Sequence, residues 1–187
     1  SIVIPTYNEE ADYLEELLES VLAQSTLEDI EIIVVDDGSE TDETVEIAED
    51  YLDERIKEEN PRIIIVIRLE ENSQGPAAAR NKGIRRATGD SDYILFLDAD
   101  DIFTPDKLEK LIDYAEATDA AVVLGAIDAY EYAEGESNLY RIARADTERS
   151  LFAGLLRKTG RLTGGLELSF EIGSNAIYRR EAFEELF

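Results

Sequence analysis

The stretch from Tyr93 to Asp106 reads YILFLDADDIFTPD. It opens with an apolar run, which is typical of a buried strand. Three carboxylates follow within four positions, those of Asp98, Asp100 and Asp101. Because like charges this close disfavour one another's ionised form, a hard divalent cation with oxygen ligands would relieve the repulsion. The stretch therefore points to a strand that ends at a cation site.

The same carboxylates have a second interpretation, in which they serve the next helix. Thr104 and Pro105 are typical of a helix start. Asp101 and Thr104 would then cap that helix, while Asp98 and Asp100 would face water. The stretch alone leaves both interpretations open, so the rest of the sequence has to decide between them.

The first 117 residues alternate between apolar strands, polar loops and amphipathic helices. Strands are expected over 2–5, 30–35, 63–67 and 93–97, and helices over 12–22, 41–56, 77–87 and 105–117. Strands rich in Ile and Val that alternate with helices favour a mostly parallel sheet with right-handed crossovers. We therefore predict an α/β fold with helices flanking the sheet.

The alternation stops after about residue 117, where the pattern becomes less regular. Strands are expected over 120–129, 130–144 (as a second strand or a hairpin through Gly135) and 174–178, helices over 146–158 and 180–187, and a mobile Gly-rich segment over 161–173. We expect a single domain over 1–187, with a regular half, 1–117, and a smaller, less regular half, 118–187.

Polar residues gather where the predicted parallel strands end. The strand ends carry Thr6-Tyr7-Asn8-Glu9, Asp36-Asp37-Gly38-Ser39, Glu71 to Gly75 and Asp98-Ala99-Asp100. In open parallel sheets, ligands bind outside the carboxyl ends of the strands. We therefore expect these segments to converge on one cleft.

Composition excludes several kinds of chemistry. The chain has no His and no Cys, so the usual zinc sites, Ser-His-Asp and Cys-His catalysis and disulfides are excluded. Its formal net charge is −26, from 44 acidic and 18 basic residues, which disfavours binding to nucleic acid or to an anionic membrane surface. An anionic ligand would need a metal ion or local Arg side chains. Chemistry must therefore rest on carboxylates, hydroxyls, Arg and Lys.

Five segments in order resemble the successive motifs of glycosyltransferase family 2, which has the GT-A fold and uses nucleotide-activated sugars. They are IVIPTYNEE at 2–10, IEIIVVDDGSETDET at 30–44, NSQGPAAARNKGI at 72–84, ILFLDADD at 94–101 and GSNAIYRREAFEEL at 173–186. The resemblance covers essentially the whole chain. It implies that 1–117 is the nucleotide-sugar-binding half and 118–187 the acceptor-side half. It also implies transfer of a sugar, with inversion, from a nucleotide-diphosphate-sugar donor, with a UDP-sugar favoured, to a hydroxyl of a saccharide, lipid or protein acceptor.

The resemblance also implies roles for residues at the strand ends. Pro5, Thr6, Tyr7 and Glu9 would line the pocket for the base and ribose, although Tyr7 could instead be a packed aromatic. Asp36 would accept a hydrogen bond from the nucleobase, and Asp37 would orient the loop or cap the helix. Arg80, and Lys82 less directly, would contact the base or diphosphate; the alternative for Arg80 is a salt bridge to a surface acid.

Asp98-Ala99-Asp100 matches the family's DxD motif, which moves the choice at the opening stretch towards the cation site. The resemblance implies that Asp100 binds Mg²⁺ or Mn²⁺ directly, and that Asp98 contacts the ribose or the metal's water shell. Asp101 and Thr104 are then assigned to the turn. A metal ion of this kind neutralises the charge that grows on the departing nucleoside diphosphate.

The family's catalytic base lies in an acidic motif beyond the segment matched here, so we expect it after Phe187 and assign none within the chain. Asp128, Glu167 and Glu171 are weaker substitutes. The sequence opens on Ser1-Ile2 without Met, and we expect it to be a piece of a longer protein. We expect a cytoplasmic location, or the cytoplasmic side of a membrane through regions outside this segment.

Two other functions remain open from the sequence. A non-catalytic fragment or scaffold that binds the nucleotide-sugar would need no base. A haloacid-dehalogenase-type phosphatase also has an apolar strand followed by D-x-D, but that motif opens its domain, whereas here it follows three strand–helix units. An NAD-type Rossmann domain is disfavoured, because no glycine follows the first strand at 5–10.

Overall fold

The computed structural model describes residues 1–25, 30–57, 63–69, 75–125, 128–131, 140–144 and 176–183. The first four strands are β1 (Ile2–Thr6), β2 (Glu31–Asp36), β3 (Ile63–Arg68) and β4 (Tyr93–Phe96). The four helices are α1 (Ala11–Leu22), α2 (Glu43–Lys57), α3 (Pro76–Arg86) and α4 (Lys107–Thr118). The later elements are β5 (Val122–Leu124), β6 (Asp128–Glu131), β7 (Tyr140–Arg144), β8 (Ala176–Arg179) and a 3-10 helix, η2 (Arg180–Phe183).

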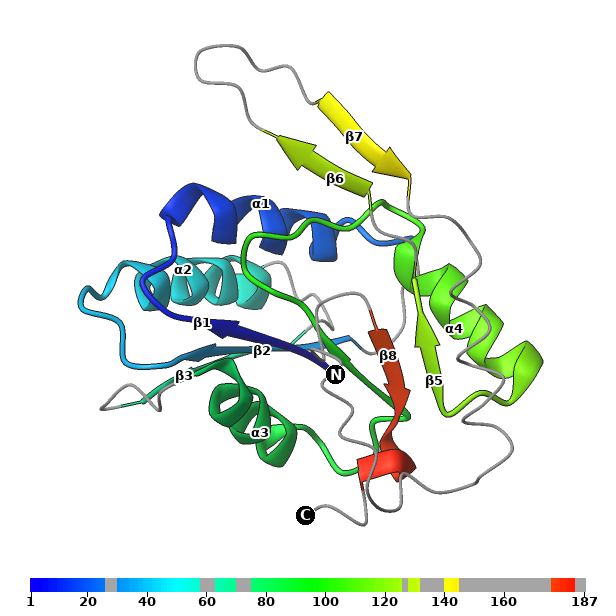
Figure 1. The fold of residues 1–187 in the computed structure, drawn as a ribbon. Coiled ribbons are helices and arrows are strands. Elements are labelled where there is room, and N and C mark those ends of the chain that lie inside the picture. The colour runs from blue at the N-terminus through cyan, green and yellow to red at the C-terminus, as the bar shows by residue number, and fades with distance from the viewer. Residues whose placement is uncertain are drawn as a thin grey trace.

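One six-stranded sheet organises the described residues, in the order β3-β2-β1-β4-β8-β5. The strands β3, β2, β1 and β4 run parallel to one another, whereas β8 runs antiparallel to both of its neighbours, β4 and β5. The strands β6 and β7 form a separate antiparallel pair, seen at the top of Figure 1. The predicted mostly parallel α/β sheet is confirmed.

Helices cover both faces of this sheet (Figure 1). Helices α1, α2 and α4 contribute to one apolar cluster, which includes Leu17, Leu18, Leu111 and Phe103, while α3 covers the opposite face with Ala79 and Ile84. All six side chains of β2 are buried, including that of Glu31. Burial on both faces explains why these strands read as continuous apolar runs.

Helix α3 lies very close to the sheet because it presents a glycine there. A Cβ atom built on Gly83 would overlap Cγ1 of Val3 and would lie 3.1 Å from Cγ2 and 3.2 Å from Cβ of the same side chain. The small-residue composition predicted a helix that packs closely against a neighbour, and that neighbour is β1.

The start of α4 differs from the prediction. The helix begins at Lys107 after an N-cap residue, Asp106, whose side chain makes no capping hydrogen bond. Capping by Asp101 and Thr104 is therefore wrong, and Pro105 lies before the helix. The backbone N–H of Leu108 instead donates to Oε1 of Gln24, over 3.0 Å. A side chain from the end of α1 thus satisfies a group that a local cap would normally serve.

The single strand predicted over 120–129 is divided in the structure: residues 122–124 form β5, and Asp128 begins β6. Of the two alternatives for 130–144, the antiparallel pairing of Tyr130 and Glu131 on β6 with β7 agrees with the hairpin. The final helix begins as the short η2. The expected helix 146–158, the mobile segment 161–173, Gly135 and the acids Glu167 and Glu171 lie outside the described residues, as does most of the loop 71–75. Among the described residues, no helix is long and apolar enough to cross a membrane.

Candidate functional site

The carboxyl ends of three adjacent parallel strands meet at one edge of the sheet. Strand β1 lies between β2 and β4, and Thr6 at its end is level with Asp36 at the end of β2. The loops after β1, β2 and β4 therefore leave the sheet side by side, as the sequence predicted. This edge is where an open parallel sheet binds its ligands.

The loops after β1 and β2 are joined by a reciprocal pair of hydrogen bonds. The backbone N–H of Asn8 donates to Oγ of Ser39 over 2.9 Å, and the N–H of Glu40 donates to Oδ1 of Asn8 over 2.8 Å. Asn8 has a φ of 51°, in the left-handed region that Asn tolerates better than most residues. These bonds give the edge a fixed shape on the side of β1 and β2.

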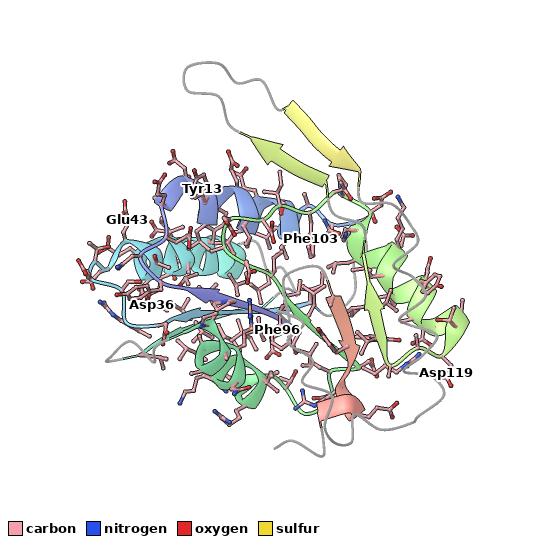
Figure 2. All side chains as sticks on the ribbon, viewed as in Figure 1. Tyr13, Asp36, Glu43, Phe96, Phe103 and Asp119 are labelled. Carbon is pink, nitrogen blue, oxygen red and sulfur yellow. The ribbon has the colours of Figure 1, made fainter. Side chains whose placement is uncertain are left out.

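Asp36 lies at this edge but faces into the protein. Its side chain is 0% exposed, and it accepts hydrogen bonds from the N–H and the hydroxyl of Ser39. Nε of Arg68 lies 3.6 Å from Oδ2 of Asp36, and the same guanidinium is paired with Asp42 and donates to the carbonyl of Ser39 over 3.4 Å. Figure 2 shows Asp36 where β2 ends. Asp36 thus fixes the positions of Ser39 and Arg68.

A small pocket lies beside these groups, at the ends of β2 and β3. Its volume is about 210 Å³, and its lining includes Gly38, Ser39, Arg68 and Leu69. Gly38 has a φ of 77°, which allows the chain to turn tightly out of β2. Arg68 is 40% exposed and offers N–H donors to a ligand in this pocket.

A second cation, Arg80 on α3, contacts the loop that follows β4. Its Nη2 donates to Oδ1 of Asp98 over 2.5 Å, and its guanidinium lies 5.9 Å from the centre of the Phe96 ring. Tyr178 on β8 packs edge-on against that ring, at 5.7 Å between centroids. Burial raises the pKa of Tyr178 to about 12, and the nearby Arg80 opposes the shift. The Arg80 side chain is only 14% exposed, so its charge lies partly inside the protein.

The acids that follow β4 form a turn that points Asp100 outward. The N–H of Asp101 donates to the carbonyl of Asp98 over 3.1 Å, while Ala99 between them is buried. Asp100 is exposed and Asp98 is 36% exposed. The pKa of Glu9 is raised by burial first, and then by the charges of Asp100, Glu10 and Asp98. Glu9, from the loop after β1, is therefore close enough to Asp98 and Asp100 for their negative charges to disfavour its ionised form.

This edge suits a hard divalent cation that also contacts a phosphate. Within the described ranges, no group of three acidic side chains is arranged as a complete metal site. Mg²⁺ characteristically takes one or two protein carboxylates and fills its remaining positions with water and substrate phosphates. Asp98 and Asp100 could supply that number, and a cation beside them would reduce the repulsion that raises the pKa of Glu9. The donor set therefore fits Mg²⁺ or Mn²⁺ held jointly with a ligand.

The other predicted site residues have different surroundings. Pro5 and Thr6 are buried, and the hydroxyl of Thr6 donates to the carbonyl of Val35 over 3.4 Å. Tyr7 is 45% exposed, so it is not a packed aromatic. Arg80 forms a salt bridge, as its alternative interpretation predicted, but its partner is Asp98 of the DxD motif and not one of the exposed surface acids. The roles given to these residues remain predictions, and Pro5 and Thr6 shape the edge from within.

The sequence interpretation placed Asn8 and Ser39 at this edge without giving them a role, and it missed Arg68. The roles of Asn8 and Ser39 could have been found from their turn chemistry, since both types hydrogen-bond readily to nearby backbone groups. Arg68 carries one local signal, because it is a charged residue directly after a run of five β-branched residues. Its place at the strand end puts it next to Asp36.

Comparison with known proteins places the chain in a family. The family model described as "Glycosyl transferase family 2" matches residues 1–187. An uncharacterized glycosyltransferase of Nostoc sp. is 34% identical over 187 residues, which is 100% of this chain and 52% of the relative. Glycosyltransferase GlyG of Streptococcus pneumoniae is 39% identical over 140 residues, or 75% of this chain and 42% of the relative. The chain thus spans about half the length of these relatives.

Solved structures share the fold. TarS 1–349 of S. aureus superposes with a TM-score of 0.65 and 26% identity, over 99% of this chain and 48% of that one. The same TarS fragment in complex with UDP-GlcNAc superposes with a TM-score of 0.64 and 24% identity, over 99% of this chain and 46% of that one. The mannosyltransferase PcManGT of Pyrobaculum calidifontis, in complex with GDP-Man and Mn²⁺, superposes with a TM-score of 0.63 and 22% identity, over 99% of this chain and 45% of that one.

These neighbours confirm the predicted GT-A fold. The match of the family model to the whole length agrees with the order of the five motifs. The chain belongs to glycosyl transferase family 2.

Proposed function

We propose that this chain forms the donor-binding part of an inverting glycosyltransferase that uses a nucleotide-diphosphate-sugar, with a UDP-sugar as the favoured donor. The observation that carries the proposal is the convergence of Asp98, Asp100 and Arg80 after β4, at the same carboxyl edge of the sheet that holds the pocket at the ends of β2 and β3. In a protein with net charge −26, a bound anion needs a local guanidinium or a metal ion, and this edge offers a guanidinium and carboxylates for a cation.

In this proposal each group has a distinct task. The base lies in the pocket against Arg68 and Ser39, and the exposed ring of Tyr7 covers the base or ribose. Asp98 and Asp100 hold Mg²⁺ or Mn²⁺ together with the diphosphate. When bound, the metal supplies Lewis-acid stabilisation of the leaving group. Arg80 fixes the carboxylate of Asp98 and carries positive charge towards the diphosphate.

Other proteins of this fold support the choice of donor. The TarS fragment was crystallised with UDP-GlcNAc, and PcManGT with GDP-Man and Mn²⁺. Membership of the family favours sugar transfer over the phosphatase alternative. The proposal has further parts. The sugar is transferred to an acceptor hydroxyl, the catalytic base is supplied from beyond Phe187, and the location is cytoplasmic. Residues 1–117 bind the donor, and residues 118–187 form the acceptor side.

Calorimetry with a panel of nucleotides tests donor binding. Titration with UDP, GDP and ADP in Mn²⁺, in Mg²⁺ and in EDTA should give metal-dependent binding that is tightest for UDP. Because a chain with 44 acidic residues can attract cations without specificity, Asp113→Asn on the exposed face of α4 is the matched control for Asp100→Asn. Absence of metal-dependent binding to every nucleotide would overturn the proposal.

Turnover separates the enzyme from a non-catalytic donor-binding protein. The longer protein that contains this chain should release UDP slowly from a UDP-sugar even without an acceptor, because water can replace the acceptor hydroxyl. Binding of UDP without any release of UDP from its sugars would favour the non-catalytic alternative. Release of phosphate from simple monoesters would favour the phosphatase.

A further inference from the structure

The end of α1 holds the loop that carries the DxD carboxylates through one buried side chain, that of Gln24. This side chain is only 2% exposed and uses both ends of its amide. Its Nε2 donates to the carbonyl of Thr104 over 2.8 Å and to the carbonyl of Ser20 over 3.0 Å. Its Oε1 accepts from the N–H of Leu108 over 3.0 Å. Gln24 therefore joins α1, the loop before α4 and the first turn of α4.

Two neighbouring residues strengthen the same junction. The hydroxyl of Ser20, on the last turns of α1, accepts from the N–H of Phe103 over 3.1 Å. The N–H of Ser25 donates to the carbonyl of Pro105 over 2.7 Å. Together with Gln24, these contacts fix the backbone over residues 103–108 against α1.

The loop is also held at its other end. The N–H of Leu97 donates to the carbonyl of Val3 over 3.1 Å, and Ala99 and Phe103 are buried in the cluster that includes the apolar face of α1. Figure 2 shows Phe103 beneath α1. Asp98, Asp100 and Asp101 therefore lie on a short segment that is anchored before and after the acids.

Gln24 makes one bond in place of a helix cap, to the N–H of Leu108, and two more that a cap would not make, to the carbonyls of Thr104 and Ser20. A Ser, Thr, Asp or Asn at the N-cap position would satisfy a free N–H of the first turn locally. Asp106 occupies that position and makes no such bond. A buried amide is acceptable only when all its hydrogen-bonding groups are satisfied, so Gln24 constrains each group that it contacts.

We propose that Gln24 is a positioning residue for the metal-binding loop: it fixes the loop so that Asp98 and Asp100 present their carboxylates to a divalent cation and a nucleoside diphosphate. This inference rests on the proposed function, because it assigns that function's cation to these two acids. A ligand set must be held within about 0.5 Å of its productive geometry, and the residues around it provide that rigidity. Partners that hydrogen-bond a metal's ligands directly contribute about 10- to 100-fold to metal affinity. Gln24 contacts the backbone that follows the ligands, so we expect an effect near the lower end of that range.

Three variants of α1 and its end test the proposal. Gln24→Glu keeps the shape but, as a carboxylate, turns a second oxygen towards the carbonyls of Thr104 and Ser20. Ser20→Ala removes one hydrogen bond to the loop and is milder, in case Gln24→Glu fails to fold. Val21→Ala is the matched control, because Val21 is fully buried on the same helix and its side chain packs in the core. Each is measured by urea unfolding, by Mn²⁺-dependent UDP binding and by hydrogen exchange over 98–108.

We expect Gln24→Glu to weaken Mn²⁺-dependent UDP binding by about tenfold or more and to speed exchange over 98–108. Ser20→Ala should change both in the same direction by less. Val21→Ala should lose stability while its affinity stays within about twofold. Equal loss of affinity in Val21→Ala and Gln24→Glu, or unchanged affinity in Gln24→Glu, would overturn the proposal.

Failure of the proposed function has a different signature, because the wild-type chain would then bind no UDP with Mn²⁺. In that case the exchange data decide whether Gln24 anchors the loop. Faster exchange confined to 98–108 in Gln24→Glu supports the anchoring, and unchanged exchange there refutes it.

Discussion

Replacing Gly83 with alanine tests the contact that sets α3 against the sheet. The added Cβ would overlap Cγ1 of Val3 and would lie 3.2 Å from its Cβ. Rotation of the Val3 side chain can move its methyl groups but not its Cβ. Val3 is fully buried on β1, which has a strand on each side, so it has little room to yield. Helix α3 must therefore move away from β1.

The expected cost follows from two opposing effects. Overpacking a core by one methyl group costs about 1–3 kcal/mol, and Ala is favoured over Gly inside a helix by about 1 kcal/mol. Because the neighbouring atoms cannot give way easily, we expect the upper part of the range and a net loss of about 1–2 kcal/mol. For a chain of this size, that lowers the unfolding temperature by about 2–8 °C.

Thermal and urea unfolding measure this loss, with Gly89→Ala as the matched control. A Cβ atom added at Gly89 would meet no other atom within 4 Å, so this variant should stay within about 0.5 kcal/mol of the wild type. The double variant with Val3→Ala should be more stable than the two single effects predict, by about 0.5–3 kcal/mol. Wild-type stability in Gly83→Ala, or strict additivity with Val3→Ala, would refute this reasoning.

Three further predictions concern Arg80, Tyr178 and the paired acids. Arg80→Ala should weaken Mn²⁺-dependent UDP binding and lower the free energy of unfolding by roughly 1–2 kcal/mol, because Asp98 loses a charged hydrogen bond at a partly exposed site. Arg80→Lys should keep part of the binding. Equal binding by the wild type and both variants would contradict the role of Arg80. The pKa of Tyr178 is raised from 10.0 to about 12, so the protonated phenol stabilises the fold below pH 10 and this contribution is lost as pH rises towards 12. Unfolding measured at pH 9 to 12 should show a smaller alkaline loss in Tyr178→Phe, and identical curves would rule out the assignment. In calorimetry, Asp100→Asn should abolish metal-dependent nucleotide binding while Asp101→Asn lowers only stability, and equal loss from both would contradict the separate roles of the two acids.

The parallel part of the sheet could be predicted because its signals are local. Each strand over 2–5, 30–35, 63–67 and 93–97 is a short apolar run followed by a polar loop, and the structure places β1 to β4 there within one or two residues. Their convergence at one edge follows from the parallel direction of the strands, whose carboxyl ends share one edge of the sheet. The position of the acids at that edge was therefore accessible from the sequence.

The errors arise where distant residues decide local structure. The start of α4 depends on Gln24, which lies 84 positions before the N–H that it accepts from. The segment over 120–129 carries one local sign of its division, Gly125 directly after β5. Its sequence does not show that β5 joins the main sheet beside β8 while β6 pairs with β7. Composition and periodicity describe neighbours in the chain, and these contacts join segments far apart in it.

The site was predicted by residue type more accurately than by orientation. Asp36 is at the expected edge, but its side chain is fully buried and occupied by Ser39 and Arg68. Burial of a strand's last residue depends on the loops that cover it, which the sequence does not specify. Arg68, the last residue of β3, lies level with Asp36 and lines the pocket, where the sequence predicted that Asp36 would contact the base.

Anomalous diffraction from a crystal grown with Mn²⁺ and UDP tests the central claim most directly. We predict one strong manganese peak between the carboxylate of Asp100 and the diphosphate, close to Asp98, with the uracil in the pocket beside Arg68. A manganese peak among other surface acids with no UDP at the carboxyl edge of β1, β2 and β4 would contradict this account.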